Sequence, residues 1–473
     1  MRALGWLAAV LLLTGPACGT MDRVDAGDAF ALDSAGDAGR DVRDDSVDAS
    51  ADIVDAAAND TIDSPTADTV EAATDAGTLD TRDVASSDAV DVTTSDVRAD
   101  TPGDAPTEAA IDVVVDSRTD VGADTSTDAA TDTIAPIDGG VSPTVFVLRV
   151  GDGTAALTNA STAIFLEEHR VSDGSLVGTP IAMPVAMSGT NRPLTLSGTA
   201  TSEGGLSLSG DGRFLVVGGY ASAPGMASIA GTTSAAVNRV IGRVDRAGGV
   251  NTSSLLDAAY SGNNIRGATT NDGSVLWATG TASSAGGVYS IALGTTGGTQ
   301  VAAMPSNLRH VGIFEGQLYA SASSSPNFGI VQIGTGLPTI AGATGTLLSG
   351  FPVASGPSSY GFAGFRRGMG TGIDTLYVAD DRAPSATGGG VQRWQLMAGT
   401  WTLTATFFDS LTAGVRSLAA YVDGANVVVV ASTAETPQRL IAYTDTGTVA
   451  PVARVLATAA ANAAYRGVAL APR

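Results

Sequence analysis

The sequence of 473 residues predicts an all-β protein whose folded part is a ring of four-stranded antiparallel sheets, a β-propeller. The first observation is the stretch Gly205–Tyr220 (GLSLSGDGRFLVVGGY), in which two apolar runs flank an Asp-Gly turn, the pattern of a β-hairpin. The second is recurrence, because the unit returns every roughly 40–60 residues, the period of a propeller blade. The third is that helical periodicity is missing from this half of the chain. The other copies are Ile265–Gly280, Leu308–Ser321, Val415–Ser432 and a looser one, Tyr360–Asp380.

The first 19 residues read as a secretory signal, with a short basic start, an apolar core and a small-residue end. Export is therefore expected. Cys18, the single cysteine, follows Gly15-Pro16-Ala17 and resembles the lipobox of bacterial lipoproteins, although Gly15 stands where Leu is usual. That resemblance implies a lipid anchor on Cys18 and an outer-membrane or cell-surface location. Cleavage after Ala17 to give a secreted soluble protein is the alternative.

Residues 20–141 form an acidic segment that carries the charge of the whole chain. It contains 31 acidic residues and 6 arginines, whereas residues 142–473 contain 17 and 18, and the net charge of the chain is −23. Asp, Ala, Thr and Ser dominate the segment, so it is expected to be a disordered tether. The near-neutral charge of residues 142–473 argues against nucleic acid as a partner.

Residues 142–473 are expected to form the propeller, with strands in groups of four. One group is predicted at Ile265–Thr270, Ser274–Gly280, Gly287–Leu293 and Gln300–Met304. The end of the chain, Ala464–Arg473, copies the first strand of a blade, while Thr144–Gly153 reads as a second strand without a first. A blade closed by one C-terminal and three N-terminal strands follows, the other two being Ala163–His169 and Ser175–Met183. The count is six blades, or seven if Met187–Glu203 contains further strands.

The phrases SGDGRFLVVGGY and DTLYVADD are similar to those of secreted bacterial β-propellers with YVTN-like or NHL-like repeats. The resemblance covers the part of the chain from Ser142 to Arg473 and implies architecture. That group contains binding modules, lactonases and other hydrolases, so the resemblance does not select a function.

Four of the expected innermost strands open with an apolar residue followed by Arg, at Arg266, Arg309, Arg416 and Arg466. Since these strands start around one mouth of the central channel, the guanidiniums are expected to form a ring suited to anionic groups. The structural alternative is that each Arg pairs with a carboxylate or caps carbonyls of the next blade. The carboxylates expected near the same mouth are Asp152, Asp380 and Asp381, and a divalent cation on them is the remaining cofactor hypothesis.

The Asp-Gly and Glu-Gly pairs of the hairpins are expected to be turn residues on the opposite face. Of the two histidines, His169 is expected to be a solvated outer-strand residue and His310 a packed core residue. The chain has no lysine, which excludes a Schiff base or a P-loop cation, and it shows neither a G-x-S-x-G elbow nor a P-loop.

We therefore expect a non-enzymatic, monomeric, surface-tethered binding module that takes a protein, a glycan or a small anionic ligand at the Arg-lined mouth. One alternative is a hydrolase of the lactonase or esterase kind, assisted by a metal at the three aspartates. The other is a structural protein of the cell envelope. The sequence does not decide between them, and it does not identify the ligand.

Overall fold

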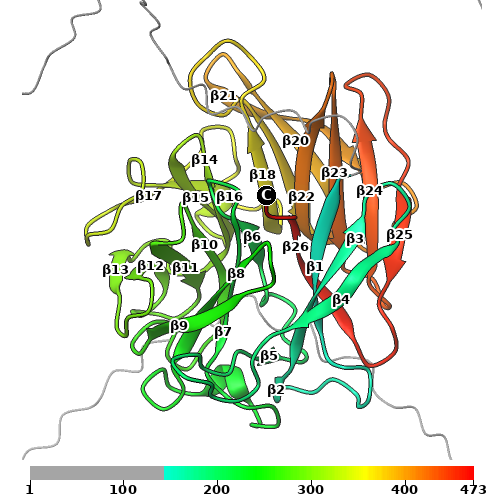
Figure 1. Cartoon of the computed structure of the whole chain (residues 1–473). Helices are drawn as coiled ribbons and strands as arrows, with labels where there is room; N and C mark the ends of the chain where they lie inside the picture. The colour runs from blue at the N-terminus through cyan, green and yellow to red at the C-terminus, as the bar shows by residue number, and fades with distance from the viewer. Residues whose placement is uncertain (1–142) are drawn as a thin grey trace, which may run out of the picture. The chain divides into compact units, whose positions relative to one another are not determined.

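The computed structural model describes residues 143–473, and these residues form a β-propeller of six four-stranded antiparallel sheets (Figure 1). The predictions for Cys18, for the signal at residues 1–19 and for the tether at residues 20–141 lie outside the described residues. Within the described part, no helix is long and apolar enough to span a membrane. Its one helix is a single 3₁₀ turn, η1 (Ile229–Gly231).

Each blade runs from an innermost to an outermost strand. Blades 1 to 3 are β26 (Ala464–Leu470), β1 (Thr144–Val150), β3 (Ile164–Arg170) and β4 (Leu176–Ala182); β6 (Leu206–Leu208), β7 (Phe214–Tyr220), β8 (Arg239–Asp245) and β9 (Val250–Leu256); β10 (Ile265–Thr270), β11 (Val275–Gly280), β12 (Gly287–Ala292) and β13 (Thr299–Ala302). Blades 4 to 6 are β14 (Leu308–Phe314), β15 (Gln317–Ser324), β16 (Asn327–Ile333) and β17 (Gly345–Leu347); β18 (Ser359–Phe365), β19 (Thr375–Asp380), β20 (Gly390–Met397) and β21 (Thr400–Phe407); β22 (Val415–Asp423), β23 (Asn426–Thr433), β24 (Arg439–Asp445) and β25 (Arg454–Thr458).

The hydrophobic core is divided among the six seams between neighbouring blades, with one apolar cluster in each seam. Alternating residues of a strand supply the two seams on either side of it. In β1, Val145 and Val147 pack against blade 6, whereas Phe146 and Leu148 pack against blade 2. This is why the inner strands are apolar on both faces rather than alternating apolar and polar.

Blade 1 closes the ring as the sequence predicts. Strand β26 pairs with β1 in antiparallel register, with Val145 opposite Leu470 and Val147 opposite Val468. In Figure 1 the red strand β26 accordingly lies beside the cyan strand β1. The closure leaves each innermost strand flanked by two others around one central channel.

The six-blade count is confirmed, because the stretch Met187–Glu203 does not contain a seventh sheet. It carries only the short strand β5 (Leu196–Ser197), which pairs with β2 (Ser161–Thr162) from the loop after β1. The stretch forms a long loop that covers part of the channel mouth.

The turn prediction is also confirmed: Gly212, Gly273, Gly316 and Gly424 all have positive φ at the hairpin tips. The prediction for His169 is wrong, because this side chain is buried, with 5% of its surface exposed. It lies opposite Val145 in the pairing of β1 with β3, and that register turns it into the seam with blade 6. There Nδ1 bonds Gly174 O at 2.9 Å.

Candidate functional site

The start of every innermost strand contributes one or two residues to a cavity on the channel axis, which we call the central mouth. The four arginines predicted from the sequence all line it. Tyr360 takes the same place in blade 5 and Gly205 in blade 2, and the loop before β6 adds Thr201, Ser202 and Glu203. The four arginines therefore converge on the mouth, as expected from the sequence. Their position alone does not say what they bind.

A β-bulge explains why these side chains line the mouth. In β10 the register with β11 shifts between Ile265 and Gly267, so that Arg266 lies at a bulge. The same shift occurs at Arg416 in β22. An unpaired residue in a bulge bends the strand and redirects its side chain. Register shifts also bracket Arg309, Tyr360 and Arg466.

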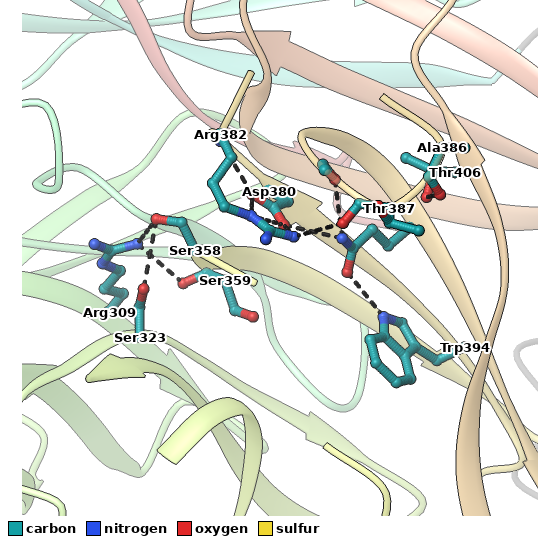
Figure 2. Close-up of polar contacts among 12 residues, drawn as sticks. Arg309, Ser323, Ser358, Ser359, Asp380, Arg382, Ala386, Thr387, Trp394 and Thr406 are labelled. Atoms are coloured by element: carbon teal, nitrogen blue, oxygen red, sulfur yellow. Dashed lines mark hydrogen bonds and ion pairs between the residues drawn. The ribbon is translucent and has the colours of Figure 1, made fainter. Parts of the chain in front are cut away.

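Three of the four arginines hydrogen-bond to neutral groups of a neighbouring blade or loop. Arg266 Nη1 donates to Asn307 Oδ1 at 2.6 Å. Arg309 Nη1 donates to Ser358 Oγ at 2.8 Å, as Figure 2 shows, and its guanidinium stacks over Tyr360 at 3.9 Å. Arg466 Nη2 donates to Gly198 O at 3.1 Å. These contacts hold the guanidiniums in place.

Arg416 pairs with a carboxylate. Its Nε lies 3.1 Å from Asp381 Oδ2. Arg466 is buried with 5% of its surface exposed, and its Nε makes no hydrogen bond within residues 143–473. Burial, together with the charge of Arg416, lowers the pKa of Arg466 to about 10. The charge of Glu203 acts in the opposite direction, and a buried cation favours anions close to it.

Glu203 is the functional side chain that the sequence reasoning missed. It is 2% exposed, and its carboxylate accepts hydrogen bonds from Tyr220 Oη at 2.5 Å, Asn264 Nδ2 at 2.6 Å and the backbone N–H of Ser197 at 2.8 Å. Burial raises the pKa of this carboxyl, although the hydrogen bonds and the charge of Arg466 act in the opposite direction. Glu203 thus anchors the long loop on blade 2 and adds one acidic group beneath the arginines.

His310 is buried, as predicted, but it also lines the mouth. It shares the bulge of Arg309, packs edge-on against Phe362 at 5.6 Å, and its pKa is lowered by burial to about 4. At neutral pH it is therefore an uncharged group. The volume open to the centre of a water molecule in the mouth is about 20 Å³, which is enough for one small group.

The three aspartates do not gather at the mouth. Asp152 is exposed and bonds the hydroxyl and N–H of Thr154. Asp380 is buried at the end of β19, where Arg382 and Gln392 bond its carboxylate; Figure 2 shows Asp380 with Arg382. Only Asp381 reaches the mouth, through Arg416. Within residues 143–473 no group of three or more His, Cys, Asp or Glu side chains is placed to hold a metal ion.

No protein-family model and no curated protein matches the chain. Solved structures are similar in architecture. A protein from Bacteroides uniformis ATCC 8492 proposed to be a 6-phosphogluconolactonase is 13% identical, over 66% of this chain and 82% of its own, with a TM-score of 0.36. A chain of the nidogen/laminin complex is 13% identical over 69% and 98%, with a TM-score of 0.39. A functionally unknown protein from Desulfotomaculum acetoxidans DSM 771 is 12% identical over 69% and 89%, with a TM-score of 0.37. At these levels of similarity the propeller assignment rests on the sheet topology, and the function on the site.

Proposed function

We propose that this protein is a non-enzymatic binding module whose central mouth takes an anionic group, a carboxylate, phosphate or sulfate, carried by a protein, a glycan or a small molecule. The observation that carries the proposal is the convergence of four guanidiniums on one cavity, where Arg466 is buried and its Nε makes no hydrogen bond within residues 143–473. Asp381, which pairs with Arg416, and the buried Glu203 add acidic groups beside them. Arginine presents a fixed fork of donors that fits such groups.

The size of the mouth sets the mode of binding. Room for one small group means that the anion enters alone and that the rest of its ligand stays outside, against the loops around the rim. The long loop that ends at Glu203 reaches the mouth through Thr201, Ser202 and Glu203, and the pairing of β2 with β5 holds this loop. A tethered module that takes the tip of a larger ligand suits display from the cell surface through Cys18, which we retain as part of the proposal.

The hydrolase alternative receives less support from this geometry. It requires Asp152, Asp380 or Asp381 to act on one substrate, whereas they lie apart and are engaged by other side chains. Within the mouth, the Glu203 carboxylate already accepts three hydrogen bonds and His310 is uncharged at neutral pH. The alternative of a purely structural envelope protein predicts no ligand at the mouth.

The test is a titration of the purified full-length protein with inorganic phosphate, sulfate and acetate, followed by calorimetry or NMR. We expect saturable binding that weakens with added NaCl, because part of the affinity is electrostatic. Each of Arg309→Gln and Arg416→Gln should weaken binding by about 10- to 100-fold, the effect of one lost charge-assisted hydrogen bond.

The matched control is Arg213→Gln, which removes an exposed arginine at a hairpin tip on the opposite face. It should leave the affinity unchanged. If Arg309→Gln and Arg416→Gln bind the anion as tightly as the parent does, the anion binds elsewhere. The absence of saturation with any of the three anions would favour the structural protein.

A further inference from the structure

A second cavity lies on the opposite face of the propeller, between blades 5 and 6, and we call it the blade 5–6 crevice. Its lining includes Thr375, Tyr377, Arg393, Gln395, Arg367 and Asp445. The volume open to the centre of a water molecule is about 260 Å³, compared with about 20 Å³ in the central mouth. This is the larger of the two cavities by that measure, and no residue of the mouth contributes to it.

The register of blade 5 builds one wall of the crevice. Thr375 pairs with Gln395 and Tyr377 with Arg393 across β19 and β20. Residues two apart on a strand, and their cross-strand partners, project from the same face of a sheet, so these four side chains form a continuous polar patch. On blade 6, Val427 lies opposite Asp445 near the tip of the sheet. The polar patch lies at one end of this seam, beside the apolar cluster that contains Tyr377 and Val427.

Hydrogen bonds between the blades hold the walls in place. Asp445 accepts from Tyr377 Oη at 2.7 Å, from Arg393 Nη1 at 2.8 Å and from the N–H of Gly447 at 2.8 Å. At the rim, Arg367 Nη2 donates to Ala425 O at 2.7 Å. Because Asp445 is buried and its oxygens are occupied, it orients Arg393 rather than attracting a cation.

The groups that remain are mainly hydrogen-bond donors. Arg393 uses Nε on Thr404 and Nη1 on Asp445, which leaves Nη2 without a partner in the described part of the chain. Arg367 Nε and the Gln395 amide likewise make no hydrogen bond there. Asp374, which is near Arg367 in the sequence, accepts from the backbone N–H groups of Arg367 and Gly368 instead of lining the cavity. A donor-rich site selects a ligand that is rich in acceptors.

We propose that the blade 5–6 crevice is a second binding site, for a hydroxylated carboxylate of about the size of a monosaccharide. The volume exceeds what a single ion needs and is below that of a drug-sized ligand. A carboxylate matches the forks of Arg393 and Arg367, and ring hydroxyls match Gln395 and the hydroxyl of Thr446. The site is independent of the mouth, so it stands whether or not the mouth binds an anion.

The test is a titration of the full-length protein, labelled on Val and Ala methyl groups, with D-glucuronate and with D-glucose, which lacks only the carboxylate. We expect glucuronate to shift the methyl signals of Val427 and Ala425, both of which line the crevice, in a saturable manner, and glucose to bind at least about tenfold more weakly. Arg367→Gln and Gln395→Ala change exposed or half-buried positions, and each should weaken glucuronate binding by about tenfold or more.

Arg213→Gln serves as the control, because it removes an exposed arginine outside both cavities and should leave the titration unchanged. Equal shifts with glucose and glucuronate would overturn the role of the two arginines. The absence of any shift of Val427 or Ala425 at glucuronate concentrations up to about 10 mM, about tenfold above a millimolar dissociation constant, would overturn the site. Shifts confined to Val468, which is next to the mouth residue Gly467, would do the same.

Discussion

Replacement of Gly467 by Ala should lower the stability of the propeller by forcing blades 1 and 2 apart at their seam. Gly467 lies in the bulge of β26, directly against the start of blade 2. A Cβ atom added there would lie 2.3 Å from Gly204 O, 2.3 Å from Leu206 N and 2.5 Å from Leu206 Cβ. Two of these three are backbone atoms, so no side-chain rotation relieves the contact.

The magnitude follows from these distances. Ordinary contacts of a Cβ atom begin near 3.4 Å, and the two backbones must therefore separate by about 1 Å. Overpacking by one methyl group costs about 1–3 kcal/mol and occasionally more, and we expect the upper end of that range because backbone lies on the contacted side. For a folded part of 331 residues, about 3 kcal/mol lowers the melting temperature by about 4 °C.

Two other glycines provide the scale for this measurement. A Cβ at Gly205 would meet Arg266 O and His310 Nδ1, both at 3.0 Å, so Gly205→Ala should cost about 1 kcal/mol. A Cβ at Gly231 would meet nothing within 4 Å, and Gly231→Ala should stay within about 0.5 kcal/mol of the parent. Thermal and urea unfolding, followed by circular dichroism, should rank the three variants in that order. If Gly467→Ala has the same melting temperature and urea midpoint as Gly231→Ala, the close approach of β26 and β6 is wrong.

Two further predictions concern single buried side chains. Arg239 is fully buried, and its guanidinium donates hydrogen bonds to the carbonyl oxygens of Val237, Thr232, Tyr260 and Asn263. Arg239→Met leaves several of these buried acceptors without a donor, so it should lower the free energy of unfolding in urea by at least about 3 kcal/mol. A loss below about 1 kcal/mol would contradict this account. Burial lowers the pKa of His310 from 6.5 to about 4, so the folded state favours the uncharged imidazole. The stability of the fold that depends on this group is fully present above pH 6.5. It is lost as the pH falls towards 4, by up to about 3 kcal/mol in the free energy of unfolding. Stability measured between pH 7 and 4.5 should therefore fall more steeply in the parent than in His310→Gln, and parallel curves would refute the assignment.

The architecture was open to prediction because the residues that build it act locally. Asp-Gly pairs demand a tight turn wherever they occur, and apolar runs on both sides of the turn make a hairpin without reference to the rest of the chain. The closing strand was recognisable because Ala464–Arg473 copies the opening of a blade whose other strands are missing. Each of these signals can be recognised in one sequence without an alignment of homologues.

The mouth was only partly open to prediction. The four arginines share a position relative to the hairpins, so their convergence could be inferred from the copies. Tyr360 occupies the same place, and aligning the looser copy by its strand would have found it. Glu203 gave no signal, because it comes from a loop whose path depends on Tyr220 and Asn264 of two different blades.

Two other side chains lie elsewhere than their positions along the strand predict. Asp152 ends up away from the mouth because its own turn, closed on Thr154, holds it in solvent. His169 was assigned to solvent from its charged neighbours Glu168 and Arg170, whereas pairing with Val145 places it in a seam. Such outcomes depend on what the next blade covers, and this information is not local.

Blade 1 is the last blade that can be completed during synthesis, because its strands come from both ends of the propeller sequence. Ribosomes deliver β1, β3 and β4 first, yet the inner edge of β1 has no partner until residues 464–470 emerge, after all the other strands. Throughout synthesis a nascent chain therefore carries an unpaired strand edge, which can capture a strand from another chain. A product cut short before Ala464 keeps this edge permanently. Strand β26 thus decides whether this edge is covered, and chains that lack it become the ones most exposed to proteases and chaperones.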